Sequence, residues 1–438
     1  MSEALNSPEA KSRRFRSYPK YKASGVEWLG DIPAHWHAIR LKRVCAFAYG
    51  DSLGSDDRAV GDVEVFGSNG SIGAHDRANT LAPCLVIGRK GSFGKVNFSR
   101  DPVFAIDTTF FVDSRFSEVE LRWLYYVLIN ARLDSATKDS AIPGLDREDA
   151  YRRIVPFCVP AEQRVIATFL DRETAKIDAL IEKKERLIEL LQEKRTALIT
   201  QAVTKGLDPN VPMKDSGAEW LGEIPAHWEV SSLKRRAKRI QTGTTPPTGE
   251  TRYYENGVIP WYGPGSFAED LPLQKPVKFI SESALHDGVA RVFEADSALI
   301  VTIGATIGKV AYMEHPGSCN QQITCVTFDI RQVFPRYGAY QLKRLEPVLR
   351  GRAPNTTLPI IDQEEVGSLS FAAPLFSEQE AIVVFLDRET AWIDALVAKI
   401  QEAIDRLKEY RTALISAAVT GKIDVQSEYE NYSEQTLF

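Results

Sequence analysis

Two long stretches of the chain place apolar residues mostly at steps of three and four, the spacing of one face of an α-helix. They run from residue 161 to about 204 and from residue 378 to about 420, and neither contains proline or glycine. The apolar positions are Ile166, Phe169, Ile177, Leu180, Ile188, Leu191 and Leu198 in the first stretch, and Ile382, Phe385, Ile393, Leu396, Ile400, Ile404, Leu407 and Leu414 in the second. The pattern predicts two amphipathic helices, each roughly 60 Å long at about 1.5 Å per residue.

A helix of this length has to bury its apolar stripe against another element. Because the two stripes are similar, the simplest partner for each helix is the other one, in an antiparallel coiled coil. Such a pair would form a rigid spacer between two globular domains. An ordinary core helix in each half of the chain is the alternative that the periodicity leaves open.

The predicted helices belong to a repeat that divides the chain into two halves. Residues 24–36 read SGVEWLGDIPAHW and residues 216–228 read SGAEWLGEIPAHW, identical at 11 of 13 positions. A Leu-Lys-Arg triplet follows each copy, and the helical segments FLDRETAKIDAL and FLDRETAWIDAL differ at one position in twelve. The ends of each half are therefore built alike.

Between these matched frames, the centres at about residues 44–160 and 236–374 differ in length and share few motifs. Turn signals such as Ser-Asn-Gly and Glu-Asn-Gly predict mixed strands and loops. A symmetric scaffold that carries two domains with different contacts explains this contrast. Drift of loops after an old gene duplication is the alternative.

The expected fold is mixed α/β, with two globular domains related by pseudo-two-fold symmetry and joined by two long antiparallel coiled-coil helices. The expected boundaries are 1–160 for the first domain, 161–205 for the first helix, 206–376 for the second domain, 377–424 for the second helix and 425–438 for a tail.

Composition restricts the class of protein. A chain of 438 residues is too long for one ordinary core, and 44% apolar with 26% charged residues is typical of a globular protein. The polar, basic start without a signal-like apolar run, and the lack of a membrane-spanning stretch, predict a cytoplasmic protein. The five scattered cysteines are expected to be buried thiols, and no metal-ligand spacing occurs.

The net charge of −5 speaks weakly against nucleic acid, but the basic residues are concentrated in runs. Residues 11–22 carry six basic and no acidic side chains, residues 85–100 carry four and none, and residues 234–239 carry five. The acidic residues are instead concentrated in the predicted helices, where carboxylates usually form a solvated face.

One motif recurs in both centres. Residues 85–96 read LVIGRKGSFGKV and residues 299–310 read LIVTIGATIGKV, each an apolar strand followed by glycines and a Gly-Lys pair. Such a turn can present backbone N–H groups and a lysine to an anion. The spacing does not fit a nucleotide P-loop. Contact with a nucleic-acid phosphate and a simple strand-to-strand hairpin both stay open.

Compared without gaps, the first copy of this motif has Arg89, Lys90 and Ser92 where the second has Ile303, Gly304 and Thr306. This difference predicts different base preferences, since Arg and Lys pair with guanine edges.

Polar loop residues that can reach base edges or phosphates are the candidate DNA contacts. Taken together they are Ser68, Asn69, Arg89, Lys90, Ser92, Lys95, Thr108, Thr109, Thr242, Thr244, Thr245, Lys309, Asn320, Gln321, Gln322, Arg352 and Asn355. Asn and Gln can bind adenine through two hydrogen bonds, and Thr can contact the thymine methyl group. Because loops are polar in any protein, an ordinary surface role is the alternative for each of them.

The order of these motifs resembles the specificity subunits of Type I restriction-modification systems. The resemblance covers about residues 18–424 and rests on WLGDIPAHW and WLGEIPAHW, GSNG and GRKGSFGKV, TGTTPP and IPWYG, and AEQRVIATFLDRET and SEQEAIVVFLDRET. It implies that each centre is a target recognition domain reading one half of an asymmetric, gapped DNA site.

The resemblance also implies that the helices set the gap and dock two methyltransferase subunits. The candidate spacer and docking residues are Phe169, Ile177, Leu180, Leu191, Phe385, Ile393, Leu396 and Leu407. S-adenosylmethionine would be bound by the methyltransferase subunits, which methylate adenine, and ATP and magnesium would belong to partner subunits of the restriction complex. This chain itself would have no catalytic residue, cofactor or metal.

Two rival functions remain to be weighed. An enzyme is disfavoured because the chain contains no Asn-Pro-Pro-Tyr or Asp-Pro-Pro-Tyr methyltransferase motif and no glycine fingerprint for a dinucleotide. A duplicated coiled-coil adaptor whose two domains bind other proteins is the stronger rival. The net negative charge of the chain favours it slightly. Salt separates the two, because binding to DNA phosphates weakens steeply as salt rises.

Overall fold

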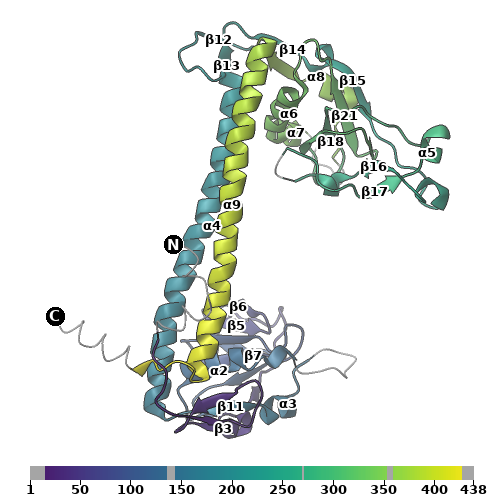
Figure 1. Cartoon of the computed structure of the whole chain (residues 1–438). Coiled ribbons are helices and arrows are strands. Elements are labelled where there is room, and N and C mark those ends of the chain that lie inside the picture. Colours follow the sequence, from purple (N-terminus) through teal and green to yellow (C-terminus); the bar gives the residue numbers. More distant parts are fainter. Residues whose placement is uncertain (1–14, 136–143, 269–270, 353–358, 427–438) are drawn as a thin grey trace. The chain divides into compact units, whose positions relative to one another are not determined.

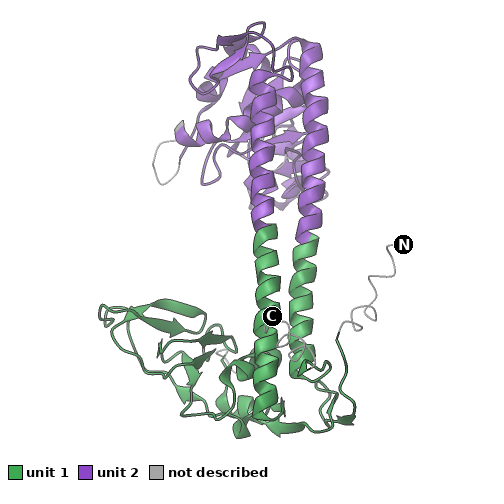
Figure 2. Cartoon of the chain, turned by 90° about the vertical axis from the view of Figure 1, so that its left-hand side faces the viewer, with its two compact units in different colours: residues 1–184, 402–438 green, residues 185–401 purple. Residues whose placement is uncertain are grey.

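The chain forms two compact units, which Figure 2 shows in different colours. The computed structural model describes residues 15–135, 144–268, 271–352 and 359–426. Unit 1 comprises residues 1–184 and 402–438, and unit 2 comprises residues 185–401. Each unit contains a β-rich domain and a part of both long helices, so this division runs through the helices. The domain boundaries expected from the sequence stay a prediction.

The two long helices are present where the sequence predicts them. Helix α4 spans Pro160–Lys205 and helix α9 spans Phe376–Val419 (Figure 1). Gly206 and Gly421, each at a φ of 71°, lie just beyond the helix ends. Glycine adopts this left-handed conformation without strain, which is why it so often ends a helix.

The helices pack against each other inside each unit through ion pairs that the repeat makes equivalent. In unit 1, Arg411 Nε of α9 lies 2.9 Å from Asp178 Oδ1 of α4. In unit 2, Arg195 of α4 lies 3.6 Å from Asp394 of α9. Asp178 and Asp394 occupy the same position in the repeat, as do Arg195 and Arg411. The predicted pairing of the two helices is confirmed.

Among its described residues, the β-rich domain of unit 1 is built from short strands and two short helices. In chain order they are β1 (Tyr21–Ala23), β2 (Asp31–Pro33), β3 (His37–Arg40), β4 (Ala48–Tyr49), β5 (Val63–Gly67), β6 (Gly70–His75), β7 (Cys84–Gly88), β8 (Val96–Ser99), β9 (Phe104–Ala105), β10 (Thr109–Val112), α2 (Leu121–Asn130), α3 (Arg147–Arg152) and β11 (Ile154–Phe157). Helix α2 packs on β7 and β8.

The domain of unit 2 contains β12 (Met213–Asp215), β13 (Glu223–Pro225), β14 (Glu229–Ser232), β15 (Ala237–Thr242), β16 (Ile259–Tyr262), β17 (Lys278–Ile280), α5 (Glu282–His286), β18 (Ser297–Val301), β19 (Val310–Met313), β20 (Ser318–Cys319), β21 (Ile323–Phe328), α6 (Pro335–Arg344), α7 (Glu346–Arg352), α8 (Gln363–Ser368) and β22 (Ser370–Ala373). Helix α6 packs on β18 and β19 (Figure 1).

The two domains share one topology although their sequences have diverged. The four-stranded sheet has the order β4-β10-β7-β8 in unit 1 and β15-β21-β18-β19 in unit 2. The three-stranded sheets β6-β5-β9 and β17-β16-β20 each contain one parallel pair, β5 with β9 and β16 with β20. The pairs β3 with β11 and β14 with β22 join the two ends of each domain. The fold is therefore mixed α/β, with two β-rich domains and two long helices packed together.

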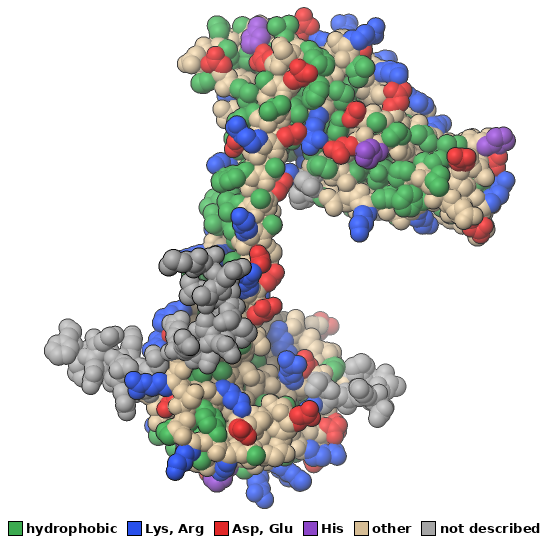
Figure 3. Space-filling view, in the orientation of Figure 1, with side chains coloured by type: hydrophobic (Ala, Val, Ile, Leu, Met, Phe, Trp, Pro, Cys, Tyr) green, Lys and Arg blue, Asp and Glu red, His purple; other side chains and the backbone are tan. Residues whose placement is uncertain are grey.

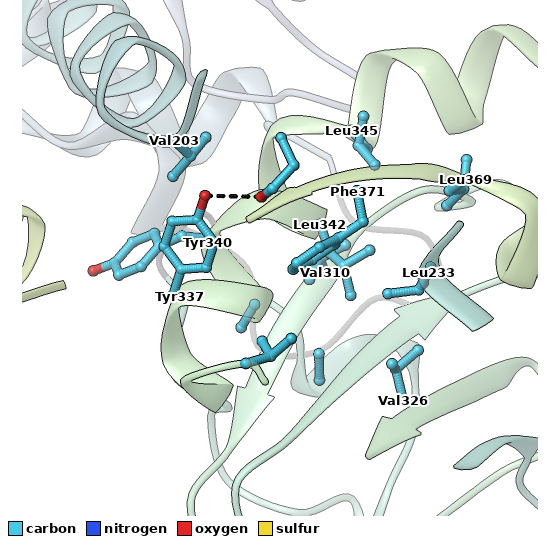
Figure 4. Packing of buried hydrophobic residues seen from close by; sticks show 14 of the residues in the cluster. Val203, Leu233, Val310, Val326, Tyr337, Tyr340, Leu342, Leu345, Leu369 and Phe371 are labelled. Atoms are coloured by element: carbon cyan, nitrogen blue, oxygen red, sulfur yellow. Dashed lines mark hydrogen bonds between the residues drawn. The ribbon is translucent and has the colours of Figure 1, made fainter. Parts of the chain in front are cut away.

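The core of unit 2 joins its domain to the end of α4. Figure 4 shows Tyr337 and Leu342 of α6 packed with Phe371 of β22 and Val203 of α4. The Tyr337 hydroxyl donates a hydrogen bond of 2.9 Å to the Ala372 carbonyl, so this buried polar group is satisfied.

A carboxylate near the start of each long helix anchors the repeated Trp-containing segment. Glu162 Oε1 accepts a 2.7 Å hydrogen bond from the Tyr18 hydroxyl, and its Oε2 lies 3.1 Å from His35 Nε2. Its counterpart in the repeat, Glu378, lies 2.8 Å from His227 Nε2 and accepts a 3.1 Å hydrogen bond from Trp228 Nε1. The two halves therefore share the contact between the carboxylate and the histidine, and only the second partner of the carboxylate differs.

The five cysteines are buried thiols, as the sequence predicts. The thiols of Cys45, Cys84, Cys158, Cys319 and Cys325 are free and buried. Burial raises the pKa of Cys45 to about 12. Within the described residues, no helix is both long and apolar enough to cross a membrane.

A buried ion pair at the end of β10 gives a test of the fold in unit 1. The Asp113 side chain is fully buried, accepts a 2.9 Å hydrogen bond from the Leu81 N–H and is paired with Arg115. Burial alone would raise the pKa of Asp113, but the Arg115 hydrogen bonds and charge and the backbone N–H groups outweigh it and hold that pKa below the usual range. We expect Asp113→Asn to lower the free energy of unfolding by about 1–3 kcal/mol at neutral pH.

Because the folded-state pKa is depressed, this stabilisation is present above the ordinary carboxyl pKa and is lost as the pH falls through the depressed value. Urea unfolding of both proteins between pH 2 and pH 7 should show the two curves converging in acid. The control, Asp149→Asn, removes an exposed pair with Arg152 and should cost no more than about 0.5 kcal/mol. A constant gap between Asp113→Asn and the parent across the whole range would contradict this account.

Candidate nucleic-acid interface

The shared Gly-Lys motif of the first domain forms the turn of a hairpin between β7 and β8. The Gly88 N–H donates to the Lys95 carbonyl and the Gly94 N–H donates to the Gly88 carbonyl, both at 2.8 Å. Gly94 has a φ of 78°, and a Cβ there would lie 2.3 Å from the Asp134 nitrogen. The turn presents Lys95, whose Nζ donates hydrogen bonds of 2.8 Å to the carbonyl and the side-chain oxygen of Asn69.

The second domain repeats this hairpin between β18 and β19. Gly308 has a φ of 91°, its N–H donates 2.8 Å to the Val301 carbonyl, and a Cβ there would lie 2.8 Å from the Glu346 carbonyl oxygen. Lys309 follows in the same place as Lys95. Of the two interpretations of the motif, the hairpin is confirmed, and contact with an anion stays a prediction.

The ungapped comparison of the two motifs is wrong by one residue. Ile87 pairs with Val96 in the first hairpin, whereas Ile300 pairs with Val310 in the second, so the second loop is one residue longer. The neighbouring backbone hydrogen bonds agree with this shift. The Arg89 N–H donates to the Thr108 carbonyl, and the equivalent bond runs from Thr302 to Gln322.

The structural counterpart of Arg89 is therefore Thr302. Lys90 corresponds to Ile303, because each forms an isolated bridge with the segment before the next short helix, at Gly144 and Ile360 respectively. An inserted residue in a short loop leaves no trace in an ungapped comparison, since only the strand pairing reveals the register.

In the first domain the structure brings most of the candidate contacts together. The Thr108 carbonyl accepts hydrogen bonds from the Arg89 N–H at 2.9 Å, the Lys90 N–H at 3.2 Å and the Ser68 hydroxyl at 2.6 Å. Asn69 and Lys95 form the pair described above, and exposed Ser92 lies in the same hairpin loop. Seven candidates thus share one group of loops.

Thr109 does not join the group. Its side chain is fully buried and its hydroxyl donates a 2.7 Å hydrogen bond to the Ile106 carbonyl, so it belongs to the core.

The candidates of the second domain also lie together. The Thr245 hydroxyl donates to the side-chain oxygen of Gln321. The Asn320 side chain donates 3.0 Å to that of Gln322. The Thr244 N–H donates 2.9 Å to the Cys319 carbonyl, which ties the two loops to each other. Thr242 lies at the end of β15 beside them.

Two candidates fall largely outside what the structure describes. Arg352 is the last residue of α7, but its side chain is not among the described parts, and Asn355 lies outside the described residues.

Both loop groups depend on a glycine that the sequence analysis did not single out. A Cβ on Gly50 would lie 2.1 Å from the Ile106 carbonyl oxygen, and one on Gly243 would lie 2.1 Å from that of Cys319. Each glycine follows the first strand of the four-stranded sheet and lets that strand approach the loop after β9 or β20. A lone glycine after a strand was the only signal in the sequence.

A basic edge lies along β15 and α8 in unit 2. Figure 3 shows Lys and Arg side chains along this edge. It borders a groove of about 820 Å³ lined by Ser232, Lys234, Ala237, Lys238, Arg239, Ile240, Gln363, Glu364, Gly367 and Ser368. Part of this basic run is engaged within the domain, since Lys238 pairs with Glu294 at 2.7 Å and Arg236 with Glu229 at 2.8 Å.

The candidate spacer and docking residues of the helices divide by burial. Phe169, Ile177, Leu191 and Ile393 are buried, and Phe385, Leu396 and Leu407 are half-buried. Leu180 is 48% exposed. The buried residues pack within the units, and a docking role for Leu180 stays a prediction.

In the described part of the chain, no group of three or more His, Cys, Asp or Glu side chains is placed to hold a metal ion.

Comparison with known proteins adds an independent observation. Residues 225–406 match the model of a family described as Type I restriction modification DNA specificity domain. Over 279 residues, 62% of this chain and 60% of the relative, the chain is 22% identical to the putative type I restriction enzyme MjaX specificity subunit of Methanocaldococcus jannaschii.

Over 211 residues, 47% of this chain and 48% of the relative, it is 26% identical to the Type I restriction enzyme EcoR124I/EcoR124II specificity subunit of Escherichia coli. The matches thus span about half to three-fifths of the length of these relatives. A solved structure from work on complex assembly and conformational transition of the type I R-M system superposes with a TM-score of 0.61 at 18% identity, over 89% of this chain and 98% of that one. At this identity the likeness concerns the fold.

Proposed function

We propose that each β-rich domain reads one half of an asymmetric, gapped DNA sequence. The chain belongs to the specificity subunits of Type I restriction-modification systems. These subunits are the non-catalytic members that give such complexes their DNA specificity. The observation that carries this proposal is the shared topology of the two domains combined with their different loop residues. One scaffold with two unlike reading surfaces suits two unlike half-sites, whereas two identical surfaces would suit a palindrome.

The long helices are proposed to set the gap between the half-sites and to dock two methyltransferase subunits. The exposed Leu180 on α4 supports a docking role, since single apolar side chains at a helix surface can be covered by a partner. S-adenosylmethionine would then be bound by the methyltransferase subunits, and ATP and magnesium by partners that complete the restriction complex. The expected location is the cytoplasm, where chromosomal DNA is accessible.

The hairpin lysines give a direct test of DNA contact. We expect Lys95→Glu and Lys309→Glu each to weaken binding of duplex DNA on the order of tenfold, because each replaces a phosphate-binding cation by an anion. A phosphate contact carries no sequence information, so the loss of affinity should be uniform across DNA sequences. The slope of log affinity against log salt concentration should become shallower by about one unit for each lysine replaced.

The measurement is fluorescence anisotropy of the assembled methyltransferase complex on labelled duplexes at several salt concentrations. Lys399→Glu, an exposed lysine on α9, serves as the charge-matched control. Unchanged affinity in both hairpin variants would overturn the phosphate assignment. DNA affinity that does not vary with salt would favour the protein adaptor over the DNA reader.

A further inference from the structure

Four positions of the two domains are equivalent in the strand register but opposite in chemistry. In unit 1, the central strand residue Phe110 pairs with Tyr49 of β4 on one side and Ile87 of β7 on the other. In unit 2, Thr324 pairs with Thr242 of β15 and Ile300 of β18 in the same way. Tyr49 thus corresponds to Thr242, and Phe110 to Thr324.

The other two positions follow from the backbone hydrogen bonds. Arg89 corresponds to Thr302, as shown above. The Arg89 carbonyl accepts from the Leu145 N–H, and the Thr302 carbonyl accepts from the Ile361 N–H, both at 2.8 to 2.9 Å. The next short helix begins two residues after each of these donors, so its first residue is Arg147 in α3 and Gln363 in α8.

The first domain fills this place with cations and aromatic rings. The guanidinium carbon of Arg89 lies 5.2 Å from the ring centre of Tyr49, and that of Arg147 lies 4.9 Å from the same ring. Arg89 also lies 5.9 Å from the ring centre of Phe110. The buried Nε atoms of both arginines have no hydrogen-bond partner among the described residues. Stacking on an aromatic ring fixes the plane of a guanidinium, and the N–H groups of its two terminal nitrogens can still donate.

The second domain fills the same place with hydroxyls and an amide. The Gln363 side-chain nitrogen donates 2.9 Å to the Thr242 hydroxyl, which lies 3.2 Å from the Thr324 hydroxyl. The Thr302 hydroxyl lies 3.1 Å from Thr324 in turn. This chain of hydrogen bonds orients the Gln363 amide through one N–H and leaves its oxygen and second N–H for another partner.

Both places are open to a ligand. Tyr49 is 49% exposed and Gln363 is exposed. Gln363 lines the groove that Lys234 and Arg239 also border. Cations along a groove attract a phosphate backbone, and an amide in its wall can then meet a base edge.

We propose that these equivalent positions are the principal base-reading site of each domain, with Arg147 and Arg89 selecting guanine in one half-site and Gln363 selecting adenine in the other. This inference rests on the proposed function. A guanidinium matches the two acceptors O6 and N7 of guanine, and an amide matches the N6 donor and N7 acceptor of adenine. The contrast between the two sites would make the recognised half-sites differ.

The test uses the complex of the full chain with its methyltransferase subunits. Its methylated motif is first determined by long-read sequencing, and binding is then measured on duplexes in which each base pair of the motif is replaced in turn. We expect Arg147→Gln to lose discrimination of about 5- to 100-fold at a guanine position of one half-site. We expect Gln363→Ala to lose a similar factor at an adenine position of the other half-site, with all other positions unchanged.

Matched controls are Arg152→Gln, on the same short helix with a 70% exposed side chain, and Asn210→Ala, an exposed amide in unit 2. Arg147→Lys keeps the positive charge but lacks the planar guanidinium that can donate two parallel hydrogen bonds to guanine. It therefore tests guanine selection if Arg147→Gln does not fold. Wild-type discrimination at every position in the Arg147 and Gln363 variants would overturn this inference alone. A parent complex that recognises no bipartite motif, or two variants that affect the same half-site, would instead overturn the assignment of one half-site to each domain.

Discussion

A chain that carries the second β-rich domain in both places is expected to direct methylation to a palindromic motif built from a single half-site. Residues 236–373 would replace residues 44–157, between the matched Leu-Lys-Arg triplets and the starts of the long helices. The graft meets the same strand ends, because β3 pairs with β11 in the same antiparallel register as β14 with β22. Two copies of one reading surface, related by the two-fold symmetry that the sequence repeat predicts, would read the same sequence on opposite strands.

The readout is adenine methylation across the genome of a host that supplies the methyltransferase. The parent motif should fall to background and the palindrome should appear with one half unchanged. The reciprocal graft, with the first domain in both places, should give the other palindrome. Retention of the asymmetric parent motif would contradict the reading of one half-site per domain, and a direct repeat would contradict the two-fold frame.

The second large effect is expected in stability, at Trp228 of the repeated segment. Its side chain is fully buried, and its ring carbon Cζ2 would lie 3.4 Å from a Cβ on Gly206 at the end of α4. Its Nε1 donates to Glu378 near the start of α9, so one residue contacts the ends of both helices. We expect Trp228→Ala to lower the free energy of unfolding by about 3–5 kcal/mol, through lost burial and the cavity left behind.

Urea unfolding followed by circular dichroism measures this loss. Trp392→Ala is the matched control, because Trp392 is 55% exposed on α9 with Lys194 over its ring, and it should cost less than about 1 kcal/mol. Equal midpoints for Trp228→Ala and the parent would show that the segment does not anchor the helices.

The long helices could be predicted closely from the sequence because their signal is local. Apolar steps of three and four over some forty residues, without proline or glycine, leave few other structures possible. The structure places the helices at Pro160–Lys205 and Phe376–Val419, within a few residues of the expected ends. The repeat also predicted that the two helices pair. The equivalent ion pairs of Asp178 with Arg411 and of Arg195 with Asp394 join them.

The proposed base-reading site could not be predicted in the same way because its members are distant in sequence. Tyr49, Arg89 and Arg147 meet only when β4, β7 and α3 are placed by the sheet, and nothing in their local sequence links them. Thr109 illustrates the opposite error. It follows Thr108 directly, but strand alternation turns its side chain into the core, so the polar residue type was misleading.

The central claim is that this chain supplies the DNA sequence specificity of a methyltransferase complex. The most direct test is methylation-sensitive long-read sequencing of genomic DNA from a host that carries the matching methyltransferase. The host is sequenced once with this chain and once without it. We predict modified adenines at one bipartite, gapped motif that disappear when the chain is removed. The same motif persisting without the chain would contradict the claim and favour an adaptor role.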